Sequence, residues 1–173
     1  MKLLYSIHKY DVSLFTWLIN ARMHATLTKS ARHISKTGDG PLYGFIGSLL
    51  YWSEGLSPFL QAILLAFVIE RPLYFVLKNS LRRNRPQATL QNFRSIITPS
   101  DQFSFPSGHT SAAFMMATLL GFYCMPLMIP LYCWAALVGF SRVVLGVHFP
   151  TDTLVDAILG IGTALFSLGH FII

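Results

Sequence analysis

The sequence predicts an all-α fold: a polytopic membrane helix bundle of five to six transmembrane helices with an N-terminal amphipathic interfacial helix. Of the 173 residues, 53% are hydrophobic and only 12% are charged, about half the charged share of an ordinary soluble domain. The hydrophobic residues form long runs, and lipid forces the backbone groups of such runs to bond within a helix. No repeat or linker divides the chain, so residues 1–173 are interpreted as a single membrane-embedded domain.

The first 40 residues differ from the rest because apolar and polar residues alternate at helical spacing. The apolar positions of this pattern are Leu14, Trp17, Leu18, Leu27, Ala31 and Ile34. Over 11–20 and 22–35 the pattern favours helices that lie at the membrane interface over a true span. The turn at 37–41 ends this interfacial part (1–40), and 41–173 form the helix bundle.

Five apolar segments follow. The segments 56–77, 107–124, 126–145 and 153–173 meet or approach the length of about 20 residues that crosses a bilayer. The fifth, 41–53, is shorter, and a sixth span is the alternative count. Proline is typical of a first helical turn, and it stands at Pro58, Pro126 and Pro150. The small residues of the last segment suit close helix packing: Gly160, Gly162 and Ala164.

The order of these segments predicts where polar chemistry gathers. Two segments end and two begin on the same membrane face, whereas the connections on the opposite face are very short. The 78–106 loop and the 141–152 turn therefore lie together, and a functional site is expected there.

Three permanent cations, Lys78, Arg85 and Arg142, stand where the segments converge. The planar donor fork of arginine fits phosphate oxygens, and lysine adds a point charge. Residues 107–109 begin a helix whose free N–H groups and positive dipole end point at the same place. Together these groups predict an oxyanion cage. The remaining arginines of this region are interpreted as marks of a membrane face or as lipid head-group contacts: Arg82, Arg83 and Arg94.

His148 and Asp152 are four residues apart across Pro150. The carboxylate can then reach back to one imidazole nitrogen and leave the other free to attack, as in a catalytic triad. His109, beside the helix start, can give a proton to a leaving alcohol. Asp156 is interpreted as an ordinary helix-dipole partner.

Three motifs carry a resemblance: Lys-x6-Arg-Pro at 78–86, Pro-Ser-Gly-His at 106–109, and Ser-Arg-x5-His-x3-Asp at 141–152. Over about residues 41–173 the chain resembles the type 2 phosphatidic acid phosphatase family, whose superfamily includes the vanadium haloperoxidases. The resemblance implies that the phosphate is bound by Lys78, Arg85 and Arg142, with hydrogen bonds from Ser107 and Gly108. It further implies a phosphohistidine at His148, orientation by Asp152 and leaving-group protonation by His109, with no metal and no cofactor.

A site at the ends of membrane helices is expected to receive its phosphate attached to a lipid. Undecaprenyl diphosphate, hydrolysed to undecaprenyl phosphate, is the first choice implied by the resemblance. Phosphatidic acid, phosphatidylglycerophosphate and lipid A phosphate stay open, because the motifs recognise phosphate and not the tail. The membrane spans argue against a vanadate-dependent oxidant. A non-catalytic lipid carrier is a more distant alternative, no nucleic-acid partner is predicted, and the oligomeric state is left open.

The charge distribution and the resemblance disagree about sidedness. Arg22, Lys29, Arg32, Lys36 and the 78–94 loop fall on the site face, which the positive-inside rule makes cytoplasmic. The resemblance implies a bacterial inner membrane with the site facing the periplasm or exterior, and this expectation is adopted.

Glu70 and Arg71 are charges inside an apolar segment. Adjacent residues do not face each other on a helix, and charges at this depth pair with groups of the bundle. Structural pairing is therefore favoured over substrate contact. Cys124 and Cys133 lie in apolar runs and are expected to be free thiols.

Overall fold

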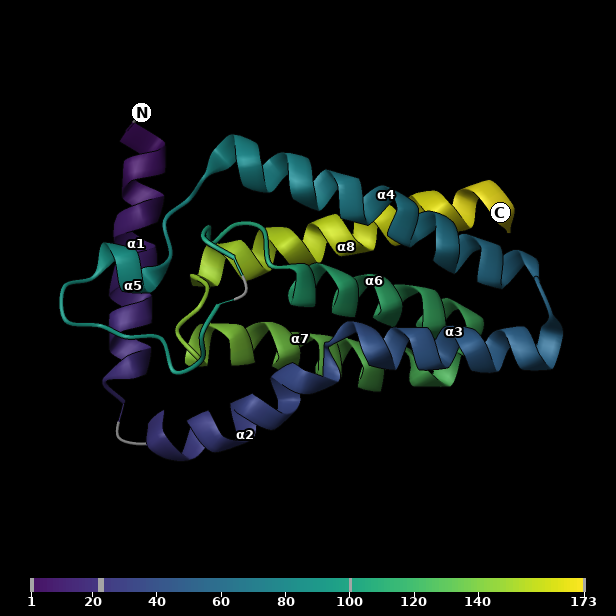
Figure 1. Cartoon of the computed structure of the whole chain (residues 1–173), viewed down its shortest axis with the longest axis horizontal. Coiled ribbons are helices and arrows are strands. Elements are labelled where there is room, and N and C mark those ends of the chain that lie inside the picture. The colour runs from purple at the N-terminus through teal and green to yellow at the C-terminus, as the bar shows by residue number, and fades with distance from the viewer. Residues whose placement is uncertain (1, 22–23, 100, 173) are drawn as a thin grey trace.

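The structure is a computed structural model that describes residues 2–21, 24–99 and 101–172, drawn in Figure 1. Arg22, one of the charges used above, lies outside the described residues. Within them the fold is all-α, as predicted, and Asn84 and Phe103 form an isolated bridge. The elements are α1 (Lys2–Ile19), α2 (His24–Thr37), α3 (Gly40–Glu54), α4 (Pro58–Leu81), α5 (Pro86–Thr89), α6 (Gly108–Tyr123), the 3₁₀ turn η1 (Met125–Leu127), α7 (Met128–Val144) and α8 (Pro150–Phe171).

Helix α6 forms the centre of the bundle, packed against α4, α7 and α8. Its buried apolar side chains meet those of α4 and α8 in one core, which includes Ile63, Ala66, Met115, Leu119 and Leu168. Because α6 is enclosed by other helices, its sequence is apolar around most of its circumference.

The small residues of α8 divide between two faces. A Cβ on Gly160 would lie 2.1 Å from the carbonyl oxygen of Ser111, and Ala164 belongs to the buried core shared with α6. A Cβ on Gly162 would meet nothing within 4 Å. The predicted close packing is confirmed for Gly160 and Ala164, which share a face four residues apart, and is wrong for Gly162.

Two of the three predicted helix openings are confirmed. Pro58 follows the N-cap Ser57, whose hydroxyl accepts a hydrogen bond from the Leu60 amide at 3.3 Å, and Pro150 opens α8. Pro126 lies instead in η1, which a bond from the Leu127 amide to the Cys124 carbonyl closes at 2.9 Å, so α7 begins only at Met128. The fixed φ of proline suits a tight 3₁₀ turn as well as an α-helix.

The N-terminal helices cover the end of the bundle. Helix α1 begins at Lys2, earlier than predicted, and runs across the ends of α7 and α8 rather than alongside them (Figure 1). Its Phe15 is fully buried against Phe149, with ring centroids 5.7 Å apart. Helix α2 packs against α7. A location of α1 and α2 at a membrane interface stays a prediction.

In the described part of the chain, three helices are long and apolar enough to cross a membrane: Pro58–Leu81, Met125–Val144 and Pro150–Phe171. Helices α3 and α6, with 15 and 16 residues, are shorter than the usual span of about 20. The count of five to six spans therefore stays a prediction. Cys124 and Cys133 are free, as expected.

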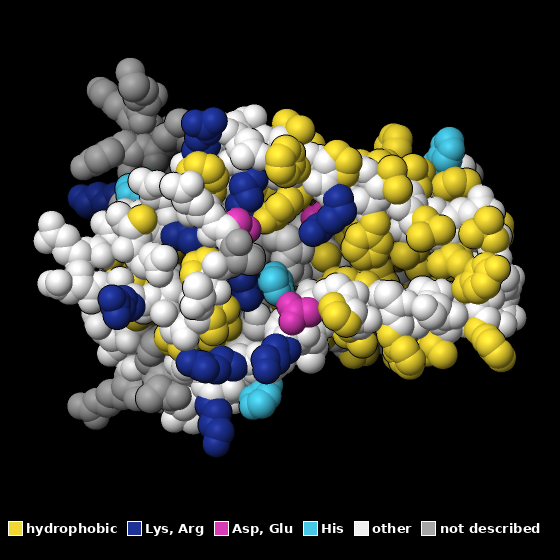
Figure 2. Space-filling model, in the orientation of Figure 1, with side chains coloured by type: hydrophobic (Ala, Val, Ile, Leu, Met, Phe, Trp, Pro, Cys, Tyr) yellow, Lys and Arg dark blue, Asp and Glu magenta, His cyan; other side chains and the backbone are white. Residues whose placement is uncertain are grey.

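The helix ends converge as the segment order predicted. The C-terminal ends of α4 and α7 and the N-terminal ends of α6 and α8 lie at the same end of the bundle (Figure 1). Basic side chains gather at this end, whereas hydrophobic side chains cover the opposite end (Figure 2).

Candidate active site

The converging ends enclose one cavity of about 290 Å³. Six of the eight residues predicted for the site line it: Lys78, Arg85, Gly108, His109, Arg142 and His148. The other two, Ser107 and Asp152, are buried behind its wall, with 0% and 1% of their surfaces exposed. Residues far apart in sequence are thus brought together as expected, and the roles assigned to them stay predictions.

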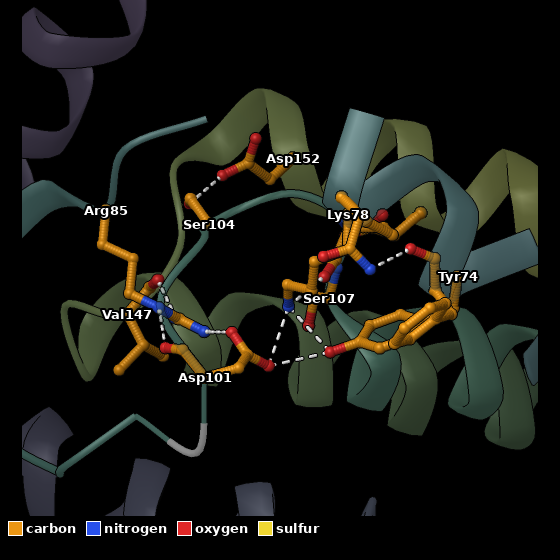
Figure 3. A network of polar contacts seen from close by, with 12 residues as sticks. Tyr74, Lys78, Arg85, Asp101, Ser104, Ser107, Val147 and Asp152 are labelled. Carbon is orange, nitrogen blue, oxygen red and sulfur yellow. Dashed lines mark hydrogen bonds and ion pairs between the residues drawn. The ribbon is translucent and has the colours of Figure 1, made fainter. Parts of the chain in front are cut away.

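An acidic residue that was not predicted, Asp101, lies among the cations of the cavity (Figure 3). Its carboxylate accepts hydrogen bonds from Lys78 Nζ at 2.8 Å and from Arg85 Nη2 at 2.5 Å. The hydroxyl of Tyr74 donates a third, at 2.8 Å. Lys78 and Arg85 are therefore already aimed at one anionic group.

The charge state of Asp101 follows from these contacts. Burial raises the pKa of this carboxyl, but the hydrogen bonds from Lys78, Tyr74 and Arg85 and the positive charge of Lys78 lower it further, so the pKa lies below its ordinary value. Asp101 is ionised at neutral pH and serves as a counter-charge to the two cations.

Arg85 also fixes the loops around the cavity. Its Nη1 donates to the Val147 carbonyl at 2.6 Å, and its Nε donates to the Asp101 carbonyl at 3.0 Å (Figure 3). One side chain thereby joins the loop after α4 to the loops before α6 and α8. Lys78 Nζ makes a further bond, to the Pro106 carbonyl at 3.1 Å.

The start of α6 forms one wall of the cavity. Ser107 is its N-cap, and the hydroxyl accepts bonds from the amide and the hydroxyl of Thr110. The Ser107 amide donates to Asp156 at 2.8 Å. This amide is therefore not free for a ligand, contrary to the expectation for residues 107–109. Asp156, fully buried, holds this turn in place and is more than a helix-dipole partner.

His148 reaches the cavity from the loop between α7 and α8, and only 2% of its surface is exposed. Its Nδ1 is buried without a hydrogen-bond partner among the described residues. Burial, followed by the charges of Arg142, Arg85 and Lys78, holds the pKa of this imidazole well below its ordinary value. The ring is therefore neutral and keeps a lone pair.

Arg142 lies beside His148 on the cavity wall. Its Nη1 donates to the Ser35 hydroxyl of α2 at 2.7 Å, whereas its Nε is buried with no partner in the described part of the chain. A buried guanidinium nitrogen without an acceptor loses several kcal/mol of hydration by order of magnitude. An anion in the cavity would supply that acceptor.

Asp152 does not make the predicted contact with His148. Its carboxylate accepts bonds from the Ser104 hydroxyl, from the Phe149 amide at 3.0 Å and from Arg83 at 2.5 Å. As the third residue of α8, Asp152 is placed to bond the amide that precedes the helix, and this local contact prevails. Asp152 therefore fixes the loop segments that carry Ser104 and His148 rather than the ring itself.

The interpretation of Arg83 as a membrane-face charge is also wrong. Its guanidinium pairs with Asp11 of α1 at 2.5 Å as well as with Asp152, and it lies 4.7 Å from the ring centroid of Phe149. The buried Asp11 could not have been assigned as its partner from the sequence, because 72 residues separate them.

His109 has a partner that was not predicted either. Its Nε2 lies 2.6 Å from Oδ1 of Asp39, which belongs to the turn between α2 and α3. The Gly-Asp-Gly sequence at 38–40 was interpreted only as a turn, yet all three residues line the cavity. An acidic residue flanked by glycines in a tight turn was the available signal.

Glu70 and Arg71 pair with each other as well as with the bundle. Arg71 Nε donates to the Glu70 carboxylate, which also accepts a bond from the Ser111 hydroxyl of α6. The long arginine side chain folds back, so adjacency does not prevent the contact. Structural pairing is confirmed for the fully buried Glu70, whereas the Arg71 side chain is 49% exposed and lines the cavity.

Comparison with known proteins follows the same motifs. The family profile of the PAP2 superfamily matches residues 55–170. The chain belongs to the PAP2 superfamily. As a PAP2 protein with three helices long and apolar enough to span a bilayer in its described part, it is an integral membrane protein.

Two curated relatives illustrate the range of this PAP2 group. The bacitracin transport permease protein BcrC of Bacillus licheniformis is 30% identical over 70% of this chain, and the match spans 61% of that relative. An undecaprenyl-diphosphatase of Sulfolobus acidocaldarius is 29% identical over 87% of this chain and 73% of its own length.

Two solved PAP2 structures share the fold. The crystal structure of Aquifex aeolicus LpxE has a TM-score of 0.81 and 31% identity, covering 91% of this chain and 93% of that one. A transmembrane PAP2-type phosphatidylglycerolphosphate phosphatase of Bacillus subtilis has a TM-score of 0.78 and 28% identity, covering 95% and 86%.

Proposed function

We propose that this PAP2 protein is a metal-independent lipid phosphatase that transfers a phosphoryl group first to His148 and then to water. One observation carries the proposal: Lys78 and Arg85 converge on the Asp101 carboxylate in the same cavity as a neutral imidazole. Cations aimed at an anion beside an uncharged nucleophile suit phosphoryl transfer, which depends on positioning and charge stabilisation.

In the first step the substrate phosphate takes the place of the Asp101 carboxylate on Lys78 and Arg85 and supplies an acceptor for Arg142. An imidazole nitrogen of His148 forms a bond to phosphorus while the bond from phosphorus to the leaving oxygen breaks. His109, held by Asp39, gives a proton to that oxygen. Ser107 serves the phosphate through its hydroxyl together with the Gly108 amide.

In the second step water attacks the phosphohistidine, with His109 now accepting a proton, and releases orthophosphate. Asp152 and Arg85 keep the loops around His148 in place through the contacts described above. The three cations stabilise the charge of the transferring group in both steps.

Undecaprenyl diphosphate is the proposed substrate and undecaprenyl phosphate the product. The name of the Sulfolobus relative supports this choice. Phosphatidylglycerophosphate and lipid A phosphate are the alternatives that the solved PAP2 structures suggest, and phosphatidic acid is a third. The proposed location is a bacterial inner membrane, with the cavity facing the periplasm or exterior.

The test is phosphate release by the purified full chain in detergent with a metal chelator present. The panel contains undecaprenyl diphosphate, phosphatidic acid, phosphatidylglycerophosphate and lipid A. We expect release by the wild type and a loss of roughly a thousandfold or more in His148→Ala, because removing a covalent nucleophile has effects of this order.

The matched control is His170→Ala, an exposed histidine at the far end of α8, which is expected to keep wild-type turnover. Retained release in His148→Ala would remove histidine from the nucleophile role. Lipid binding by the wild type without any phosphate release would favour the carrier alternative.

A further inference from the structure

The mechanism above leaves one cation of the cavity without a role. Arg71 lines the cavity together with Phe67, Tyr74 and Lys78 of the same helix. These residues follow one another at intervals of four, three and four, so they share one face of α4. At a rise of about 1.5 Å per residue, Arg71 lies roughly 10 Å along the helix from Lys78, toward the middle of the membrane segment.

Buried groups hold Arg71 in position. The fully buried Glu70 carboxylate accepts the bond from Arg71 Nε and is itself bonded by Ser111 of α6. This arrangement occupies Nε and directs the rest of the guanidinium toward the cavity. With 49% of the side chain exposed, Arg71 keeps access to a ligand.

The guanidinium lies next to the turn that presents His109. Both terminal nitrogens of Arg71 are 3.4 Å from the position that a Cβ on Gly108 would take. The ring of Tyr74 contacts both cations of this face, with its centroid 5.2 Å from Arg71 Cζ and 4.6 Å from Lys78 Nζ. Arg71 and Lys78 therefore form two separate positive positions along one wall.

The apolar part of the cavity lining places the lipid tail on the Arg71 side. Tyr43, Phe67 and Ala112 line the cavity, and Phe67 precedes Arg71 by one helical turn in the direction away from Lys78. A lipid phosphate whose terminal group lies among Lys78, Arg85 and Arg142 extends its leaving group past His109 toward these residues. That leaving group passes the Arg71 guanidinium.

We infer that Arg71 binds the inner phosphate of a lipid diphosphate and thereby selects diphosphates over phosphate monoesters. The inference rests on the proposed function. His148 bonds to the terminal phosphorus, the bond from that phosphorus to the bridging oxygen breaks, and the bridging oxygen leaves on the lipid monophosphate, which Arg71 holds. Water then releases orthophosphate from His148. A monoester has an uncharged alkyl group at the same place and gains little from Arg71.

The test compares two substrates with the same tail, farnesyl diphosphate and farnesyl monophosphate, using initial rates of phosphate release by the full chain in detergent. In Arg71→Gln we expect kcat/KM for the diphosphate to fall about tenfold to a hundredfold, the range for loss of a charge-assisted hydrogen bond. The value for the monophosphate is expected to stay within about threefold. Arg71→Lys, which keeps the charge without the planar fork, is expected to lie between wild type and Arg71→Gln.

Arg82→Gln is the matched control, since Arg82 is an exposed arginine at the end of the same helix outside the cavity lining. Both substrates are expected to keep their wild-type values in this variant. An equal loss for both substrates in Arg71→Gln, or no loss for either, would overturn the inference.

A binding measurement separates this inference from the proposed function. Titration calorimetry of the wild type and Arg71→Gln with inorganic pyrophosphate and orthophosphate needs no turnover. Pyrophosphate binding is expected to weaken about tenfold or more in Arg71→Gln, with orthophosphate binding unchanged. That result would sustain the Arg71 assignment even if neither lipid were hydrolysed, and unchanged pyrophosphate binding would overturn it.

Discussion

At the scale of single residues, Asp101 determines the resting charge of the cavity. Its carboxylate neutralises Lys78 and Arg85 before any substrate arrives. A phosphate that enters has to compete with an internal anion that is already in position. The substrate gains because its phosphate carries more charge and more acceptor oxygens than one carboxylate and also reaches Arg142.

Asp101→Asn is therefore expected to tighten binding of orthophosphate by about tenfold, because it removes the competing charge while keeping the shape of the side chain. The measurement is titration calorimetry of the purified protein with orthophosphate. Glu54→Gln, which neutralises an exposed acid at the opposite end of the bundle, is the control. Weaker or unchanged binding in Asp101→Asn would show that Asp101 supports the anion site instead of competing for it.

Residue roles were predictable from the sequence only where helix ends determine position. Lys78, His109 and Arg142 lie at the ends of apolar segments, so segment order alone places them together. Asp39 and Asp101 lie in a turn and a loop whose paths depend on the whole fold. The contact between Asp152 and His148 failed because a local bond to the Phe149 amide competes for the same carboxylate.

At the scale of elements, the contact between α6 and α8 brings the two helices that carry the Pro-Ser-Gly-His turn and Asp152 together. The backbones approach closely at Gly160, where any side chain would collide with the Ser111 carbonyl. Ser111 also bonds Glu70, so the spacing of α6 and α8 is linked to the position of Arg71.

Gly160→Ala is expected to lower the free energy of unfolding by about 1–3 kcal/mol, the usual cost of overpacking a tight contact. The fall should appear as a lower midpoint of thermal unfolding in detergent. Gly162→Ala, two residues along the same helix and open to space, is expected to match or slightly exceed the wild type. Equal shifts in both variants would mean that helix propensity, not the contact with α6, determines the effect.

Element boundaries were predicted well where proline and apolar runs coincide, as at Pro58 and Pro150. They were less exact where a 3₁₀ turn absorbs the proline, as at Pro126. The early start of α1 was missed because His8, Lys9 and Tyr10 interrupt its apolar pattern. Packing across the ends of α7 and α8 stabilises the helix in spite of that composition.

At the scale of the whole molecule, charge is concentrated at the cavity end (Figure 2). Part of this charge is explained by the site itself, since Lys78, Arg85 and Arg142 line the cavity. Lys29, Arg32 and Lys36 of α2 line a neighbouring cavity that shares Asp39, His109 and Arg142 with it. The positive-inside rule counts all these residues although several are committed to the site, which weakens its assignment of a cytoplasmic face.

Sidedness can be measured with Gln87→Cys, an exposed position beside the cavity, after replacing Cys124 and Cys133 by serine. We expect a membrane-impermeant thiol reagent to label it in bacterial cells with a permeabilised outer membrane. Glu54→Cys, at the opposite end, is expected to be protected in the same cells. The reverse pattern would place the cavity in the cytoplasm.

The contacts of Asp11, Ser35 and Asp39 give this fold a consequence for its synthesis. These N-terminal side chains reach Thr151, Arg142 and His109, so residues from both halves of the chain complete one site. During translation the early helices leave the ribosome long before their partners exist. A nascent chain therefore has no finished catalytic centre until α8 has been inserted, and lipid turnover starts only with a completed polypeptide.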